Sequence, residues 1–186
     1  MRGIQMLRIV LAGGSADHGE TRYSRAARDF GRRVAEEGWV LRTGGGAGHS
    51  IMGAASDGAL EAGGRVEGVI LRKFWKHRHR GLHSMHAYST FALRKAGLFN
   101  GGAATVVFPG GYGTLDELGD VLVLRQTGFL RQPIVLLNLF GYYDALLAWD
   151  RHAGREGFLY GRRFFQVARS CSGAVQALRR CFVKIL

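Results

Sequence analysis

The sequence predicts an α/β fold, a Rossmann-like doubly wound parallel sheet with helices on both faces. Short, continuous apolar runs alternate with helical patterns along the chain, as in strands that are buried on both faces. Three of these runs end in glycine-rich loops, where such sheets bind their ligands. With 186 residues, 47% of them hydrophobic, the chain suits one core, so we expect a single nucleotide-binding domain over residues 1–186.

The first half of the chain predicts three strands and two helices. The strands are the apolar runs 7–11, 39–41 and 66–71. A helix over 21–37 has one apolar face, formed by Tyr23, Ala26, Ala27, Phe30 and Val34. Gly38 follows it, where a left-handed helix cap is favoured. A second helix, 51–62, stops at a pair of glycines.

The second half continues the alternation after an irregular basic segment at 72–86. Strands are expected at 104–108 and 134–137, with a short edge strand at 164–168. Helices are expected at 89–99, 115–127, 142–153 and 172–183. Trp39 and Trp149 are predicted to lie in the core, and Cys171 and Cys181 to face it from a helix.

Charge and cysteine content narrow the class of protein. The net charge of +12 favours anionic partners, namely phosphates, nucleic acid or a membrane surface. Most of the cations are Arg, which genome composition alone also produces, so we expect nucleic acid not to be the partner. The two cysteines have no zinc spacing. No signal-peptide pattern and no apolar run of about 18 residues occurs, so we expect a cytoplasmic protein without a membrane partner.

The three glycine-rich loops are expected to meet at one crevice. They are Gly13-Gly14-Ser15, Gly44–Gly48 and Gly110–Gly113. The third lies in the string Pro109–Glu117, where a strand ends and a helix is predicted to begin at about Thr114. Free backbone N–H groups and the positive end of the helix dipole favour a phosphate there. A valine at Gly113 is predicted to crowd the anion, because only glycine allows close approach of the backbone.

A helix capped by its own side chains is the alternative explanation of that string. Thr114 is a candidate N-cap, and Glu117 follows three residues later, as in a capping box. On the chemical explanation, the Glu117 carboxylate stabilises positive charge on a ribose ring or activates water. Arg94 then anchors the phosphate or stabilises the leaving base, unless it only forms a structural ion pair with Glu117.

Beyond these patterns, the string Pro109–Glu117 resembles the P-G-G-x-G-T-x-x-E motif of the LOG family, cytokinin-activating phosphoribohydrolases often labelled lysine decarboxylases. Arg94-Lys95, on the helix before the motif strand, matches the family's Arg-Lys pair. Gly13-Gly14-Ser15 and Gly44-Gly45-Gly46 look like the family's first two loops, and the likeness covers roughly residues 7–160. The chain departs from the family at Val123, where a Thr is usual, and in its basic segment, where many members keep an acidic residue.

The resemblance implies a hydrolase that cleaves the N-glycosidic bond of a nucleoside 5′-monophosphate to free base and ribose 5-phosphate, with cytokinin nucleotides among the candidate substrates. It implies Arg94 and Glu117 as catalytic residues, no metal and no cofactor, and at least a homodimer. The substrate-binding residues that it implies are Ser15, Gly45, Gly46, Lys95, Gly110, Gly111, Tyr112, Gly113, Thr114 and Asp116.

Other functions stay open. A carrier of a phosphorylated cofactor, like the molybdenum cofactor carriers, uses similar glycine loops but needs no paired Arg and Glu. The basic, aromatic stretch 72–80 is a solvated loop, a lid or subunit contact near the site, or a nucleic-acid groove. The histidines at positions 77, 79, 83 and 86 lack a metal-binding pattern.

Overall fold

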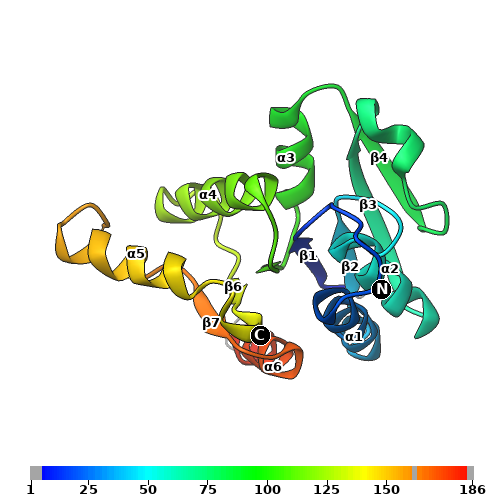
Figure 1. Ribbon diagram of the computed structural model, residues 1–186. Coiled ribbons are helices and arrows are strands. Elements are labelled where there is room, and N and C mark those ends of the chain that lie inside the picture. Colours follow the sequence, from blue (N-terminus) through cyan, green and yellow to red (C-terminus); the bar gives the residue numbers. More distant parts are fainter. Residues whose placement is uncertain (1–5, 161–162, 184–186) are drawn as a thin grey trace, which may run out of the picture.

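The computed structural model describes residues 6–160 and 163–183, so the ends of the predicted domain 1–186, and residues 161–162, lie outside the described residues. The fold is a seven-stranded parallel sheet of order β4-β3-β2-β1-β5-β6-β7 (Figure 1). The strands are β1 (Arg8–Ala12), β2 (Val40–Thr43), β3 (Arg65–Leu71), β4 (Ser84–Tyr88), β5 (Ala104–Val107), β6 (Ile134–Leu137) and β7 (Gln166–Ala168).

Helices cover both faces of this sheet. They are α1 (Arg22–Glu36), α2 (Ile51–Glu61), α3 (Phe91–Phe99), α4 (Tyr112–Gln126), α5 (Asp144–Arg155) and α6 (Cys171–Val183), with short 3-10 helices η1 (Arg72–His77) and η2 (Leu139–Gly141). One core cluster joins the sheet to α1, α2 and α6, and the other joins it to α3, α4 and α5. The predicted doubly wound α/β fold is therefore confirmed.

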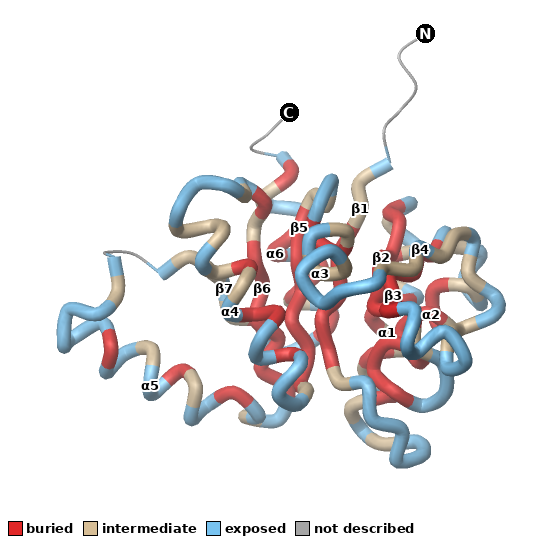
Figure 2. Tube along the Cα trace, turned by 90° about the horizontal axis from the view of Figure 1, so that it is seen from above, coloured by how far each residue is buried: buried red, intermediate tan, exposed pale blue. Residues whose placement is uncertain are grey.

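The alternation of side chains along each strand builds these two cores. In β1, Ile9 and Leu11 enter the first cluster, whereas Val10 and Ala12 enter the second. Both sets are almost fully buried because helices cover both faces, and Figure 2 shows the strands as the buried centre of the molecule. This two-sided burial is why the strands read as continuous apolar runs.

The sheet reverses its winding direction between β1 and β5. The chain proceeds outward from β1 through β2 and β3 to β4, and then returns to place β5 on the other side of β1. The loops that follow β1 and β5 diverge at this point, which is where open α/β sheets bind their ligands. The Gly14 N–H donates to the Pro109 carbonyl across 3.1 Å and ties the two loops together.

The basic segment is more ordered than the sequence predicts. Residues 72–77 form η1, and Ser84–Tyr88 form β4, which pairs in parallel with β3 at the edge of the sheet. The prediction of an irregular segment over 72–86 is wrong in this respect. The strand carries Ser84 and an exposed His86 and is only half-buried, so it lacks the apolar run of the inner strands.

Four further details correct the sequence prediction. The fourth helix begins at Tyr112, ahead of the predicted start, and α5 begins at Asp144. Trp39 is buried as predicted, but Trp149 is 58% exposed on α5, which projects from the body of the fold (Figure 1). Cys171 is buried, whereas Cys181 is only partly buried. None of the helices in the described ranges is long and apolar enough to cross a membrane.

Candidate active site

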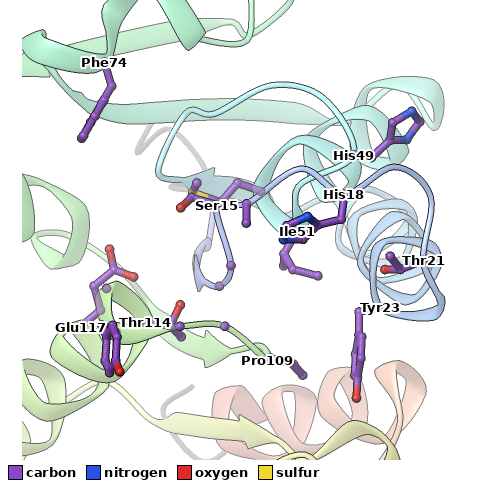
Figure 3. A pocket seen from close by; sticks show the side chains of 18 of the residues that line it. Ser15, His18, Thr21, Tyr23, His49, Ile51, Phe74, Pro109, Thr114 and Glu117 are labelled. Atoms are coloured by element: carbon purple, nitrogen blue, oxygen red, sulfur yellow. The ribbon is translucent and has the colours of Figure 1, made fainter.

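A cavity of about 640 Å³ opens at the point where the loops after β1 and β5 diverge. Its volume is in the range of small-molecule sites. Glu117 and Thr114 of α4 lie at one side of it, and Thr21 and Tyr23 at the start of α1 lie at the other (Figure 3). The predicted site residues that line it are Ser15, Arg94, Gly110, Gly111, Tyr112, Gly113, Thr114 and Glu117.

The loop after β5 has all its carbonyl groups engaged. The Phe108 and Gly110 oxygens accept from the Tyr143 and Tyr142 hydroxyls at 2.6 and 2.7 Å. The Pro109 oxygen accepts from Gly14, and the Gly111 oxygen accepts from the first turn of α4. By contrast, the four N–H groups of residues 110–113 donate to no protein group among the described residues. Such a row of free N–H groups at a helix N-terminus favours an anion.

Gly110 is required by the packing of this loop. A Cβ at this position would collide with the Thr114 hydroxyl and lie 2.7 Å from the Gly14 nitrogen. At Gly111 and Gly113, by contrast, a Cβ would meet no protein atom within 4 Å. The first glycine therefore holds the loops together, whereas the later two leave open space above the backbone.

The capping explanation of Thr114 and Glu117 is wrong. Because α4 begins at Tyr112, its N-cap is Gly111, which makes no side-chain capping bond. The Thr114 hydroxyl has no hydrogen-bond partner among the described residues, although the residue is buried. Glu117, one turn further on, accepts no hydrogen bond from the backbone of the cap. The Thr114 hydroxyl is thus available for a ligand, and Glu117 is not used as a cap.

Glu117 is a buried carboxylate whose partner is Arg94. Only 8% of its side chain is exposed, and Arg94 Nη1 donates to its Oε1. Burial raises the pKa of Glu117 above the ordinary value of 4.5, while the charge and hydrogen bond of Arg94 oppose this rise. The ion pair considered in the sequence analysis exists, and it lies in the wall of the cavity.

Besides Glu117, the guanidinium of Arg94 has two further neighbours, and its helix is anchored at the other end. Its Nε donates to the Val69 carbonyl at 3.2 Å, at the end of β3. A Cβ on Gly44 would lie 2.5 Å from Arg94 Nη2, so the loop after β2 needs a glycine there to admit the side chain. At the far end of α3, Arg42 Nη1 donates to the carbonyls of Gly97 and Asn100, which anchors the helix.

A buried ion network supports that anchor. Glu67 accepts from Arg8 and Arg42 at 2.7 and 2.9 Å. Burial raises the pKa of Glu67, but the hydrogen bonds from the two arginines outweigh this and lower it overall. The carboxylate therefore stays charged and holds Arg42 against the end of α3.

Lys95 and Asp116 contact each other rather than the cavity. Lys95 Nζ bridges Asp116 Oδ1 at 2.9 Å and Asp120 Oδ2 at 2.8 Å, so it joins α3 to α4. The hydrogen bond that Lys95 donates to Asp120 is the main cause of its raised pKa. Neither Lys95 nor Asp116 lines the cavity. Together with the Arg94–Glu117 pair, this bridge fixes the spacing of the two helices.

Gly45 and Gly46 also lie outside the cavity lining. Gly45 accepts from the His79 N–H at 2.8 Å, and Gly46 forms an isolated bridge with Arg78. The loop after β2 therefore holds the basic segment in place. It contributes to the site through His49, which lines the cavity, and through the space that Gly44 leaves beside Arg94.

Several cavity residues escape sequence reasoning. Leu71, Phe74 and Phe91 also line the cavity, and Phe74 and Phe91 are aromatic side chains that remain substantially exposed, with Phe74 on the same side as Glu117 (Figure 3). His18 and His49 lie on the side of Thr21 and Tyr23 (Figure 3). Phe74 follows β3 and Tyr142 follows β6, so their position after a strand was the available signal. Within the described residues, no cluster of three or more His, Cys, Asp or Glu side chains has the proximity that a metal site needs.

Comparison with known proteins gives the same assignment as the motif. Residues 52–181 match the family described as "Possible lysine decarboxylase", a range that includes Arg94 and Glu117. The cytokinin riboside 5′-monophosphate phosphoribohydrolase of Rhodococcoides fascians is 36% identical over 164 residues, which cover 86% of this chain and 82% of that protein. The rice enzyme of the same name, LOG, is 35% identical over 82% of this chain and 63% of its own length.

Solved structures share the fold at lower identity. A molybdenum cofactor binding protein from Rippkaea orientalis superposes with a TM-score of 0.75 at 22% identity, covering 96% of this chain and 99% of that one. The molybdenum cofactor carrier protein of Chlamydomonas reinhardtii has a TM-score of 0.74 at 22% identity over 96% of this chain and 99% of its own. At this identity the likeness establishes the architecture alone. Because the family match spans most of the chain and curated LOG proteins align over most of its length, the chain belongs to the LOG-type "possible lysine decarboxylase" family.

Proposed function

We propose that this protein hydrolyses the N-glycosidic bond of a nucleoside 5′-monophosphate and releases the free base and ribose 5-phosphate. The relatives at 32–36% identity are named for this reaction on cytokinin riboside 5′-monophosphates, so cytokinin nucleotides are the first substrates to test. The observation that carries the proposal is a buried Glu117–Arg94 pair in the same cavity as four free backbone N–H groups.

The two halves of the cavity suit the two halves of such a substrate. The N–H groups of residues 110–113 and the Thr114 hydroxyl receive the 5′-phosphate. One helical turn further along α4, Glu117 lies where the ribose attached to that phosphate would extend. Beyond it, Phe74 and Phe91 offer aromatic surface to a base.

The reaction then needs a carboxylate at this place. As the bond from C1′ to the base nitrogen breaks, its electron pair leaves with the base and positive charge develops on the sugar. The Glu117 carboxylate stabilises that charge and takes a proton from water as the water oxygen bonds to C1′. The departing base takes a proton from solvent and Glu117 returns its own to solvent, so the products are the neutral base and ribose 5-phosphate.

Arg94 has a second role beside Glu117. Its charge opposes the effect of burial on the carboxylate, because it lowers the pKa that desolvation raises. Its guanidinium carries further N–H donors, which serve the substrate phosphate or the leaving base. We propose that Lys95 and Asp116, which lie outside the cavity lining, assist by fixing α3 against α4 rather than by touching the substrate.

We also propose that the protein works as a homo-oligomer, at least a dimer. Several large apolar side chains are exposed on α4, α5 and the loops beside them, namely Leu115, Val123, Phe129, Trp149 and Phe158. Large apolar side chains exposed in this number are typical of interfaces, and a second copy of the chain would cover them.

The test is incubation of the purified protein with a panel of nucleoside 5′-monophosphates that includes a cytokinin riboside 5′-monophosphate. Chromatography measures the free base, and an enzymatic assay measures ribose 5-phosphate. We expect equal amounts of both products and none from the corresponding nucleosides, which lack the phosphate. Tight binding of the panel without release of base contradicts the hydrolase and favours a carrier of phosphorylated ligands.

A further inference from the structure

Two tyrosines follow β6 and reach the loop after β5. The Tyr142 hydroxyl donates to the Gly110 carbonyl at 2.7 Å, and the Tyr143 hydroxyl donates to the Phe108 carbonyl at 2.6 Å. Tyr142 lines the cavity and is 45% exposed, whereas Tyr143 is buried in the core. Of these two similar hydrogen bonds, only the one made by Tyr142 lies at the cavity.

The planarity of the peptide bond gives the Tyr142 contact a consequence for the cavity. In a trans peptide the C=O of one residue and the N–H of the next point in opposite directions. Fixing the Gly110 carbonyl toward Tyr142 therefore fixes the Gly111 N–H away from Tyr142. No protein oxygen among the described residues accepts that N–H.

We propose that Tyr142 is a positioning residue for phosphate binding: its hydroxyl locks the Gly110–Gly111 peptide so that the Gly111 N–H stays free for the anion. This inference deepens the proposed function and rests on the phosphate half of it. A glycine pair is where such a lock is needed, because peptides flanked by glycines rotate at little steric cost. Without it, the Gly110 carbonyl oxygen is free to turn toward the anion and repel it.

Tyr142 acts through the loop rather than on the ligand. A tyrosine hydroxyl has a single hydrogen to donate, and here the Gly110 carbonyl takes it. The hydroxyl therefore presents only lone pairs to any further group, which do not bind a phosphate oxygen. In the cavity wall, Tyr142 therefore orients the backbone at Gly110 and does not bind the ligand itself.

A strained turn immediately before Tyr142 positions this hydroxyl. Phe140 adopts φ +54°, the one non-glycine residue in the described ranges with a positive φ, and Gly141 follows at +75°. Asn138 closes the turn, since its side chain accepts from the Tyr143 N–H at 2.8 Å. A left-handed non-glycine residue costs free energy and persists where its surroundings require it.

Aromatic packing holds the tyrosine ring independently of its hydroxyl. The Tyr142 ring stacks edge-on against Tyr143 at 5.0 Å and against Tyr23 at 5.8 Å between centroids. Removal of the hydroxyl alone therefore leaves the ring in place. Tyr142→Phe isolates the hydrogen bond from the packing.

Tyr143 supplies the matched control. It makes the same kind of bond to the carbonyl two residues earlier, but the residue after Phe108 is Pro109, which has no N–H. Tyr143→Phe thus releases a peptide that offers nothing to an anion. Since the Tyr143 hydroxyl is buried, this variant lowers the melting temperature more than Tyr142→Phe does.

The experiment measures phosphate binding and catalysis separately. Calorimetry gives the Kd of inorganic phosphate and of AMP, with adenosine as a probe without phosphate, and NMR follows the Gly111 amide during the phosphate titration. We expect Tyr142→Phe to weaken phosphate and AMP about five- to tenfold, the effect of one hydrogen bond. The phosphate-induced shift of the Gly111 amide should shrink, adenosine binding should not change, and Tyr143→Phe should keep the phosphate Kd within about twofold.

The outcomes separate this inference from the proposed reaction. Equal phosphate affinity and an unchanged Gly111 shift in Tyr142→Phe, or no phosphate binding by the parent protein, overturn the positioning role. If the parent protein hydrolyses AMP and Tyr142→Phe has the same KM for AMP as the parent, the positioning role fails and the reaction stands. If the parent protein cleaves no nucleotide but Tyr142→Phe weakens phosphate, the positioning role is supported and the reaction fails.

Discussion

At the scale of single residues, the site depends on how Glu117 is buried. A carboxylate with 8% of its side chain exposed loses hydration, which raises its pKa, and a single arginine compensates for part of that loss. The sequence predicted that Arg94 and Glu117 belong together, because the motif spacing pointed to both. It did not predict that Gly44 makes room for the guanidinium, since a steric requirement of this kind depends on packing across the sheet.

The raised pKa of Glu117 predicts the pH dependence of the reaction. If the ionised carboxylate is the active form, kcat/KM falls as the pH drops through a pKa higher than the ordinary 4.5. Removing Arg94, which holds the pKa down, should move this limb to still higher pH. A pH profile of the parent protein and of Arg94→Gln measures both. A limb at or below 4.5 in the parent protein contradicts the assignment.

The raised pKa of Glu117 also makes the stability of the folded protein depend on pH. Because the pKa of Glu117 is higher in the folded than in the unfolded chain, the folded protein binds the proton more tightly. This contribution is fully present below the unfolded value and is lost as the pH rises through the folded value. Glu117→Gln should remove this pH dependence. Denaturant titrations below the unfolded pKa and above the folded pKa measure the free energy of unfolding of both proteins.

The glycines of the loop after β5 differ in what they do. Gly110→Ala places a Cβ against Thr114 and Gly14, so we expect a lower melting temperature and weaker binding together. Gly113→Ala meets no protein atom, so the melting temperature should hold while the crowded anion binds less well. Thermal unfolding and phosphate titration of the two variants distinguish these effects. Equal destabilisation by both would contradict the packing argument.

At the scale of elements, the basic segment departs most from its prediction. Its η1 turn and β4 strand carry little apolar periodicity, because β4 is a half-buried edge strand and η1 is exposed. The loop after β2 orders the segment through backbone bonds, which side-chain patterns do not reveal. By contrast, the motif helix was predicted well except at its start, where Gly111 rather than Thr114 is the cap.

The segment's charges suggest a role in attracting anions to the cavity. Arg72, Lys73, Lys76 and Arg80 are exposed and form no salt bridge with a described carboxylate, and Phe74 between them lines the cavity. We expect Lys76→Gln with Arg80→Gln to raise KM for a nucleotide several-fold at low salt, with kcat little changed. The difference should shrink at high ionic strength, because salt screens exposed charges.

The control for this element is Arg180→Gln on α6, an exposed cation on a helix that does not line the cavity. It removes a charge without touching the site, so its KM should stay near that of the parent protein. Unchanged nucleotide kinetics in the double variant, together with a loss of salt-dependent DNA binding, would favour the nucleic-acid explanation instead.

At the scale of the whole molecule, the winding of the sheet explains why the glycine loops matter. Alternating apolar runs and helical patterns sufficed to predict the parallel sheet, because each strand is buried on both faces. The order of the strands could not be derived in the same way. The prediction that three loops meet at one crevice holds fully for the loops after β1 and β5, while the loop after β2 reaches the site through His49 and the space beside Gly44, not through Gly45 and Gly46.

The exposed apolar surface gives a prediction about assembly. If a second copy covers α4 and α5, Val123→Asp on α4 should convert the protein to a monomer, because burying an unpaired charge is costly. Light scattering after size-exclusion chromatography measures this, with Arg180→Gln as the variant that should retain the parent mass. A parent protein that is monomeric at high concentration contradicts the proposal.

The central claim is that one cavity binds a nucleotide phosphate and breaks the bond to its base through Glu117. Its most direct test is the turnover and binding of a hydrolysed nucleoside 5′-monophosphate by Glu117→Gln, which keeps the shape of the side chain and removes its charge. We predict that kcat falls by about a hundredfold or more while the Kd of the nucleotide stays within a few-fold and the variant remains folded. A folded Glu117→Gln protein that releases base and ribose 5-phosphate at the parent rate would contradict this account.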